Sequence, residues 1–333
     1  MRILVTGGAG FIGSHFVKRL RAAGEDVVVL DKLTYSGNRA NLPDDVELHE
    51  GDIAQPSDVA SAAAGVEAIV NFAAETHVDR SILTAESFGR AEFRGTQVLL
   101  EHARKTGIRL VQVSTDEVYG DLEAGGSSKE TDPLRPSSPY SAAKAAGDLL
   151  IPAYVRTFGV DASITRGSNT YGPNQYPEKF ISLSVTNALD GEPLPIYGDG
   201  RQVRDWLYVE DHCAGIELVL RTGEPGEIYN VGGGDEHENI DVAERIVELT
   251  GIDRSLLRRV GDREGHDRRY SLDSSKLRDM GWSPSVSFED GLARTVDWYR
   301  ENRSWWEEIR ERPEYREYYE RQYGDRLANA TAV

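Results

Sequence analysis

The chain has 333 residues, of which 39% are hydrophobic and 28% charged, and this composition excludes collagen-like and wholly disordered chains. The formal net charge of −18 repels phosphate backbones and anionic lipids, so we expect neither a nucleic-acid nor a membrane partner. A single cysteine, Cys213, permits no intramolecular disulfide, and no apolar run approaches the roughly 20 residues of a membrane-spanning helix. We expect a soluble, cytoplasmic protein.

The first half of the chain alternates short apolar runs with longer amphipathic stretches. Strands are predicted at Ile3–Val5, Val27–Leu30, Val46–Leu48, Ala68–Phe72, Leu110–Val113 and Ala162–Thr165. Helices are predicted at Phe11–Ala23, Phe88–Lys105 and Tyr140–Phe158. Short apolar strands separated by helices predict parallel βαβ units with helices on both faces of the sheet.

A glycine motif connects the first predicted strand to the first helix. Gly7, Gly10 and Gly13 fit a turn that lets the backbone approach a pyrophosphate and packs the helix closely on the strand. The helix N-terminus at Phe11 and Ile12 would offer free N–H groups to the anion. The order strand, glycine turn, helix predicts a Rossmann-type doubly wound α/β fold that binds a dinucleotide.

The second predicted strand ends at an acid, Asp31, eighteen positions after Gly13. A carboxylate at this offset can bind ribose hydroxyls and would repel a 2′-phosphate, which favours NAD over NADP, although Lys32 beside it weakens the inference. Further cofactor contacts are predicted after the later strands. Together with the glycine turn, the predicted cofactor set comprises Asp31, Lys32, Leu33, Thr34, Asp52, Ile53, Phe72, Ala73, Ala74 and Thr76, and also Tyr140 and Lys144.

Two groups of residues suggest chemistry. Tyr140 and Lys144 lie four positions apart at the start of a predicted helix, so the phenol and the ammonium share a face, and the cation is expected to lower the pKa of the phenol. Thr115, Asp116 and Glu117 follow the fifth predicted strand, at the sheet edge where ligands bind in open α/β sheets. Two adjacent carboxyls there can serve as separate acid and base if their environments split their pKa values.

These motifs together resemble the extended short-chain dehydrogenase/reductase superfamily and, within it, the dTDP-glucose 4,6-dehydratase family. The resemblance covers roughly residues 1–306 and includes the stretches 73–82, 171–179, 197–200, 204–212 and 265–270. It implies a lyase with tightly bound NAD, no metal and a homodimer built on the helices at Phe88–Lys105 and Tyr140–Phe158. The sugar would be oxidised at C4 with Tyr140, Lys144 and Thr115, and would lose water through Glu117 at C5 and Asp116 at C6.

The resemblance also implies a nucleotide-sugar site in the second half, where Lys179, Arg201, Arg204, Arg258, Arg259, Arg263, Arg268 and Arg269 cluster despite the acidic balance. Predicted substrate contacts are Thr76, Thr115, Asn169, Lys179, Phe180, Pro195, Ile196, Tyr197, Arg204, Asn239, Asp262, Arg263 and His266. Four positions depart from the family pattern: Ala91 and Glu92 replace Thr-Asn, Thr170 replaces a second Asn, and Glu264 replaces Pro. Ala91 and Thr170 imply weaker binding of the cofactor. A buried Glu92 would need a partner or a raised pKa.

We expect residues 1–170, with return segments at about 205–233, to form the NAD-binding domain, and residues 171–204 and 234–333 to form a smaller, mostly α substrate domain. Glu227–Val231 reads as a strand that returns to the main sheet. The tail from Glu307 to Arg326 predicts an exposed helix with i,i+4 ion pairs. The alternatives are another NAD-dependent sugar-nucleotide dehydratase, a 4-epimerase, which the two acids disfavour, and a non-catalytic NAD-binding scaffold.

Overall fold

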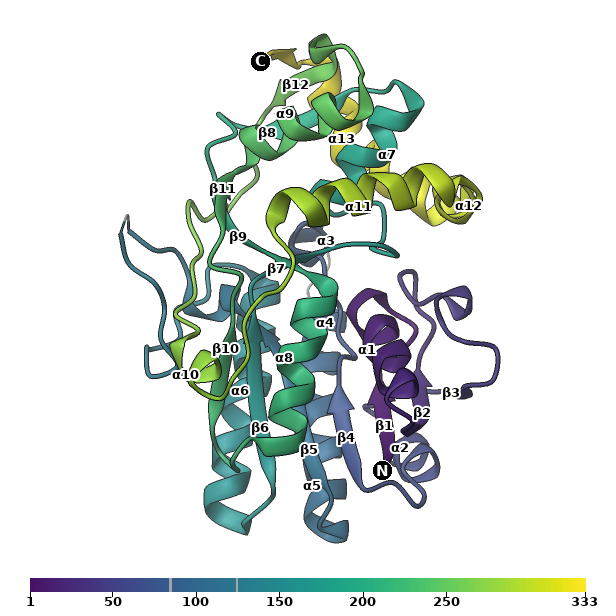
Figure 1. The fold of residues 1–333 in the computed structure, drawn as a ribbon, viewed down its shortest axis with the longest axis vertical. Helices are drawn as coiled ribbons and strands as arrows, with labels where there is room; N and C mark the ends of the chain where they lie inside the picture. The colour runs from purple at the N-terminus through teal and green to yellow at the C-terminus, as the bar shows by residue number, and fades with distance from the viewer. Residues whose placement is uncertain (84–85, 124) are drawn as a thin grey trace.

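A seven-stranded parallel sheet forms one half of the molecule in the computed structural model, which describes residues 1–83, 86–123 and 125–333 (Figure 1). The strand order is β10-β6-β5-β4-β1-β2-β3. The strands are β1 (Arg2–Thr6), β2 (Asp26–Asp31), β3 (Glu47–Glu50), β4 (Ala68–Asn71), β5 (Arg109–Thr115), β6 (Ala162–Gly167) and β10 (Ile228–Val231). The order confirms the doubly wound fold, and β10 confirms the predicted returning strand because it pairs in parallel with β6.

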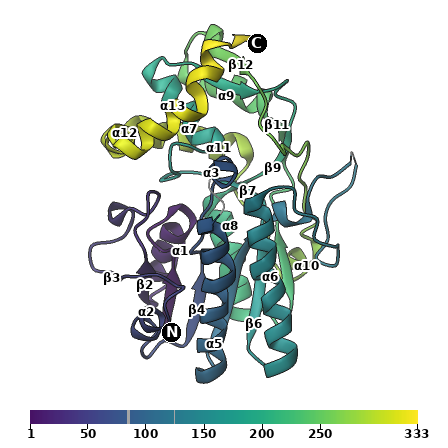
Figure 2. The same cartoon turned by 180° about the vertical axis from the view of Figure 1, so that it is seen from behind.

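Helices cover both faces of this sheet. One face carries α1 (Phe11–Ala22) and α8 (Val209–Thr222), and the other carries α2 (Pro56–Ala62), α5 (Thr96–Thr106) and α6 (Pro139–Phe158) (Figure 2). Successive residues of a strand point to opposite faces, so Ile3 and Val5 join the core under α1 while Leu4 joins the core under α5. Because both faces are covered, the middle of β1, of β2 and of β4 is a continuous apolar run, which is why the sequence revealed these strands.

The predicted helix at Phe88–Lys105 is wrong in one respect, because it is not a continuous α-helix. The structure divides this stretch into α4 (Glu86–Gly89), the π-helical segment η2 (Arg90–Gly95) and α5. A π turn holds one more residue than an α turn and rotates the side chains that follow it. In this chain the wide turn contains the buried Glu92.

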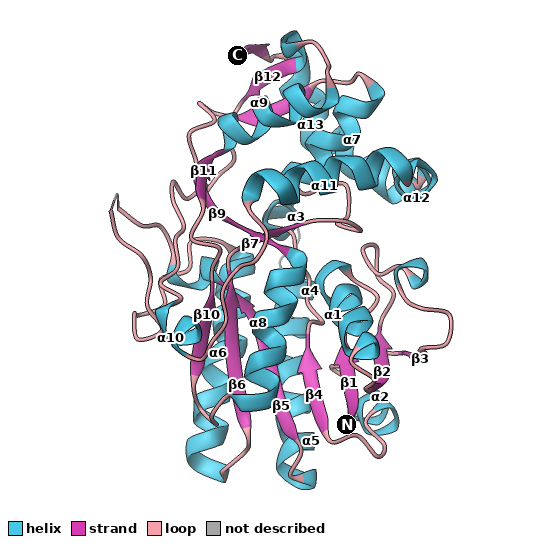
Figure 3. Cartoon of the chain, in the orientation of Figure 1, coloured by secondary structure: helices cyan, strands magenta, loops and turns pink. Residues whose placement is uncertain are grey.

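The other half of the molecule stands over the carboxyl edge of the main sheet (Figure 3). One small sheet contains β7 (Asn169–Tyr171), β9 (Val203–Tyr208) and β11 (Glu236–Glu238), and another contains β8 (Leu194–Tyr197), β12 (Leu257–Val260) and β13 (Thr331–Ala332). The helices here are α3 (Val78–Leu83), α7 (Phe180–Asp190), α9 (Asn239–Thr250) and α11 (Phe288–Glu301). Short elements complete the chain: η1 (Arg39–Asn41), η3 (Asp116–Tyr119), η4 (Arg254–Leu256) and α10 (Ser275–Asp279). This second half contains α3, β7 and the residues after Tyr171, except for α8, β10 and α10, which pack with the main sheet.

The prediction of one exposed helix for the tail is also wrong. The tail forms α12 (Arg303–Glu311) and α13 (Pro313–Ala328), and α13 buries Tyr315, Tyr318 and Tyr323. Tyr315, Tyr319 and Tyr323 recur every four residues and therefore share one helix face with the neighbouring Tyr318, and this face packs on the rest of the chain. The predicted i,i+4 ion pairs exist between Arg303 and Glu307 and between Arg312 and Glu308. Within the described residues, no helix has the length and apolar character to cross a membrane.

Candidate active site

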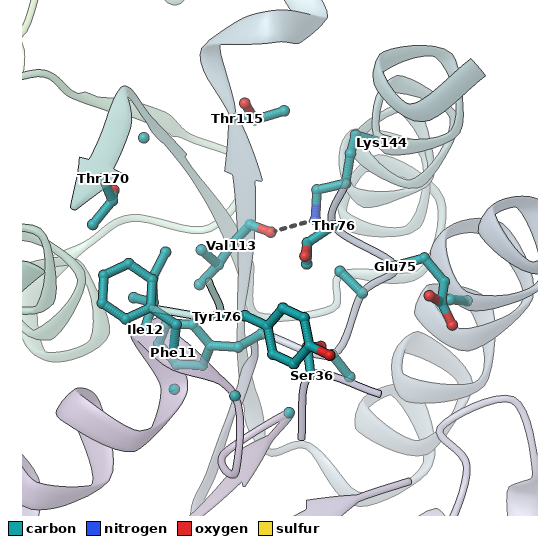
Figure 4. A pocket seen from close by; sticks show the side chains of 18 of the residues that line it. Phe11, Ile12, Ser36, Glu75, Thr76, Val113, Thr115, Lys144, Thr170 and Tyr176 are labelled. Atoms are coloured by element: carbon teal, nitrogen blue, oxygen red, sulfur yellow. Dashed lines mark hydrogen bonds between the residues drawn. The ribbon is translucent and has the colours of Figure 1, made fainter. Parts of the chain in front are cut away.

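A cavity of about 330 Å³ opens at the carboxyl edge of the main sheet, where the loops after β1 and β4 diverge. Ligands bind at such switch points because neighbouring loops leave the sheet in opposite directions. All five predicted catalytic residues line this cavity, and so does every predicted cofactor residue except Leu33. Figure 4 shows Lys144 reaching from α6 toward Val113 at the end of β5, with Phe11 and Ile12 of the glycine turn across the cavity.

The glycine turn has the close packing that a dinucleotide requires. Gly7 has a φ of +68°, and a Cβ at this position would lie 2.5 Å from the backbone nitrogen of Ala73. A Cβ on Gly13 would lie 2.3 Å from the carbonyl oxygen of Gly7. The capping residue of α1 is Gly10, which has no side chain to cap the first turn, so the helix N-terminus keeps its N–H groups for an anion. These residues fit the pyrophosphate of NAD.

The acid at the end of β2 lies where the sequence predicts. Both oxygens of Asp31 accept backbone N–H groups, from Ala9 at 2.9 Å and from Leu33 at 2.8 Å, and each oxygen keeps a lone pair for a ribose hydroxyl. Burial raises the pKa of Asp31, and these two hydrogen bonds oppose the rise. Lys32 turns to Asp52, with its Nζ 3.2 Å from the carboxylate. The neighbouring cation is therefore paired with another acid, which supports the preference for NAD.

The two adjacent acids after β5 occupy different environments. The Thr115 hydroxyl donates to Asp116 at 3.0 Å and accepts the backbone N–H of Glu117 at 3.3 Å, which caps the short helix η3. Burial, followed by the charge of Glu117, raises the pKa of Asp116 well above its usual range. Burial also raises the pKa of Glu117, but the charges of nearby cations oppose it. This difference favours a protonated Asp116 beside an ionised Glu117.

The Tyr140–Lys144 pair opens α6. A capping box between Ser138 and Ser141 starts the helix and places Tyr140 in its first turn. Lys144 donates to the Val113 carbonyl at 3.0 Å. The expectation of a lowered phenol pKa is wrong for this structure, because the net pKa of Tyr140 is raised. Burial raises the pKa of Tyr140 well above 10, as do the nearby carboxylates, foremost Glu117, while a hydrogen bond with Thr115 opposes them.

Three cations surround the two acids from the other half of the chain. The positive charges of Arg263, Lys179 and Arg204 all act to lower the pKa of Glu117. Of these three, Lys179 lines the cavity, as do the predicted substrate residues Thr76, Thr115, Asn169 and Phe180. A set of cations beside the reacting groups suits a diphosphate.

The predicted nucleoside contacts lie farther out, and none of them lines the cavity. The Asn239 backbone N–H donates to the Gln202 carbonyl at 3.0 Å, and the Gln202 side-chain amide donates to the Asp262 carboxylate at 3.1 Å. His266 lies 2.6 Å from Asp262. Ile196 is completely buried in the core of the second half, and Pro195 is buried in the same strand, β8. Their contacts with a substrate stay predictions. Arg268 and Arg269 are paired with Asp199 and Glu236.

Sequence reasoning missed a polar cluster around Asp79. Its Oδ2 accepts from Tyr197 and from Gln322, each at 2.9 Å, and its Oδ1 lies 3.6 Å from Arg263. Tyr323 of α13 stacks on Tyr197. These residues are far apart in the chain, and no local pattern connects them. The cavity also contains Ala91 and Thr170, and Thr170 is hydrogen-bonded to His212 at 2.7 Å.

Comparisons with known proteins agree with this geometry. A family model described as GDP-mannose 4,6 dehydratase matches residues 4–295. A dTDP-glucose 4,6-dehydratase of Streptomyces niveus is 53% identical over 323 residues, which cover 93% of this chain and 96% of the relative. The crystal structure of DesIV, a dTDP-glucose 4,6-dehydratase from Streptomyces venezuelae with NAD bound, matches with a TM-score of 0.90 at 54% identity and covers 93% of this chain and 100% of its own.

A UDP-glucose 4-epimerase of Thermus thermophilus shares the fold at lower identity. Its structure, also in complex with NAD, matches with a TM-score of 0.87 at 35% identity and covers 91% of this chain and 100% of its own. This epimerase and the dehydratase DesIV thus share the fold and bind NAD. By its family match and its relatives, the chain belongs to the GDP-mannose 4,6-dehydratase family and, within it, to the dTDP-glucose 4,6-dehydratases.

Proposed function

We propose that the protein converts dTDP-glucose to dTDP-4-keto-6-deoxy-glucose with bound NAD. The observation that carries the proposal is the pair of neighbours Asp116, which is buried, and Glu117, which is half-buried, because their environments favour opposite protonation states beside Tyr140. A 4-epimerase needs no such pair, because it eliminates nothing. The two relatives from Streptomyces named above are dTDP-glucose 4,6-dehydratases.

Each residue has a defined part in this reaction. Tyr140 reacts in its phenolate form and, aided by Thr115, takes the proton of the sugar 4-hydroxyl as C4 is oxidised. NAD, when bound, takes up the hydride from C4 and later returns it at C6. The 4-ketone acidifies the C5 hydrogen, which Glu117 removes and afterwards gives back. Asp116 donates its proton to the departing C6 hydroxyl, and the proton taken from the 4-hydroxyl balances that loss.

Asp116 is suited to donate a proton because its surroundings favour the protonated carboxylic acid over the carboxylate. Its Oδ1 accepts from Thr115, while its Oδ2 is buried without a partner among the residues that the structure describes. An ionised carboxylate in that place would leave a charge unsolvated, whereas a carboxylic acid needs one acceptor for its hydrogen. The departing C6 hydroxyl would supply that acceptor.

Incubation of the purified protein with dTDP-glucose tests the proposal. We expect a product that has lost the mass of one water and absorbs ultraviolet light in alkali as 4-ketosugars do. A product of unchanged mass with inverted C4 would instead show an epimerase, and the absence of any product would favour a scaffold. Parallel incubations with GDP-mannose and UDP-glucose test the nucleotide, and a preference for either would overturn the thymidine assignment.

We also propose that the protein acts in the cytoplasm as a homodimer that joins α5 and α6 to the same helices of a second copy. Large apolar side chains are exposed on this face: Phe93 by 45%, Leu149 by 62% and Phe158 by 49%. Exposed apolar residues gathered on neighbouring helices are typical of an interface. Light scattering after size exclusion should give twice the chain mass, and Leu149→Glu should give the single mass. A parent protein of single mass would contradict the dimer.

A further inference from the structure

The side chain of Glu92 is fully buried beside the catalytic lysine. Glu92 lies in the π-helical segment η2, and its residue exposure is 0%. This segment packs tightly on α6, because a Cβ on Gly147 would lie 3.0 Å from the Glu92 carbonyl oxygen. The carboxylate points at Lys144, with Oε2 3.3 Å from Nζ. The resemblance described above implies an uncharged Asn here, and this chain has a buried acid instead.

Lys144 is the single cation paired with Glu92 among the residues that the structure describes. Neither carboxylate oxygen of Glu92 meets hydrogen-bond geometry with a partner there. The ammonium in turn has three N–H donors, of which one is directed to the Val113 carbonyl at 3.0 Å. Glu92 therefore faces the ammonium as an ion-pair partner, and the remaining donors are directed to the side of the ligand and of the Tyr140 phenol.

The other charges around Glu92 do not replace Lys144. From α6, Asp148 adds a negative charge, which is paired with Arg166 at 2.9 Å, and from the loop after β4, Glu75 adds another. Tyr140 of α6 faces Glu92 as well. On the solvent side, Glu86 of α4 and Arg94 of η2 itself are exposed. Removing Glu92 would therefore leave Lys144 with its full charge directed at the active site.

We propose that Glu92 is a positioning residue that acts through Lys144: it fixes the ammonium at the end of β5 and offsets its charge on Tyr140. The inference rests on the proposed function and adds to it an effect of the Glu92 charge on the phenol of Tyr140. When Glu92 is ionised, the pair is neutral and Tyr140 holds its proton firmly. When Glu92 is protonated, the ammonium acts on the phenol undiminished. Burial raises the pKa of Glu92 to about 7 although Lys144 opposes it, so both forms exist near neutral pH.

The first test follows the pH profile of C4 oxidation in a single turnover, read as reduced cofactor absorbance. Glu92→Gln keeps the shape of the side chain and removes its charge. We expect the midpoint of the rising limb to move down by about one pH unit, the lower end of what one close charge does. Glu92→Asp, which keeps the charge, should keep the parent profile, and so should Glu86→Gln, which removes an exposed charge from the neighbouring α4.

A second test needs no turnover. Infrared difference spectra of protein with ¹³C-labelled glutamate should show a carboxylic acid band that titrates near neutral pH and is absent in Glu92→Gln. A parent protein without such a band overturns the proposal, even if the variant does not fold. So does an active parent whose pH profile is unchanged in Glu92→Gln. A parent that shows the band but does not dehydrate dTDP-glucose would refute the proposed function and leave the Glu92–Lys144 pair standing.

Discussion

Replacing His212 with glutamine should make the protein less sensitive to acid. His212 lies on α8, 2% exposed, with Nδ1 2.7 Å from the Thr170 hydroxyl. Its ring presses against Gly167, where a Cβ would lie 2.4 Å from Cε1. Burial lowers the pKa of His212 to about 4 from its usual 6.5. The folded protein therefore holds the neutral ring while the unfolded chain takes up a proton.

The sign and the size of the change in unfolding free energy with pH follow from this difference in protonation. A histidine whose folded pKa is lowered contributes stability above the unfolded pKa, and this contribution is lost as the pH falls from about 6.5 toward 4. At about pH 5 the unfolded chain has taken up nearly the whole proton, and the loss amounts to about 2 kcal/mol relative to about pH 7.5. Glutamine can bond to Thr170 but does not titrate, so the variant lacks this loss.

Urea unfolding at both pH values, with NAD in excess, measures the effect. Other groups titrate in parent and variant alike, so the quantity of interest is the difference between the two pH-induced changes in unfolding free energy. We expect the parent to lose about 2 kcal/mol more than His212→Gln. Equal losses of unfolding free energy in the two proteins would refute the reasoning. They would mean that the His212 ring is protonated or hydrated in the folded protein.

Three further changes have definite expected results. Glu117→Gln should slow dehydration by about 10²–10⁴-fold while C4 oxidation still proceeds, as quenched-flow product analysis would reveal, and near-parent turnover would remove Glu117 from its role. Gly13→Ala should yield protein purified without NAD, because its Cβ would lie 2.3 Å from a facing carbonyl oxygen, whereas Gly89→Ala, with open space around it, should retain the cofactor. Asp148→Asn should lower the unfolding free energy by about 3–5 kcal/mol, since it leaves the buried Arg166 without its ion pair, and unchanged denaturant midpoints would argue against that pairing.

The parallel sheet could be predicted because its signals are local. Strands buried on both faces are rich in apolar residues, so a run such as Leu110–Val113, interrupted by Gln112 alone, stands out and lies within β5. The glycine turn and the Tyr140–Lys144 spacing are local as well, because each lies within one turn or one helix. Their positions around one cavity follow once the strands are parallel, since carboxyl ends then share an edge.

The π-helical segment could not be predicted from local sequence signals in the same way. Apolar residues continue at a helical spacing from Phe88 through Leu100, and the pattern is compatible with one α-helix. The wide turn at Arg90–Gly95 depends on the packing of Glu92 against α6, whose residues are some fifty positions away. The same applies to α13, whose tyrosines look like part of a charged, exposed face until Asp79 and Tyr197 are beside them.

By itself, the amino-acid sequence determined the order of strands and helices, the dinucleotide turn and the identity of the acids and the tyrosine, because each depends on residues within one element or its flanks. The tertiary structure alone decided how strongly each acid holds its proton, which cation faces which carboxylate, and that Lys144 shares its charge with Glu92. Those properties depend on burial and on distances between segments that the chain brings together only when it folds.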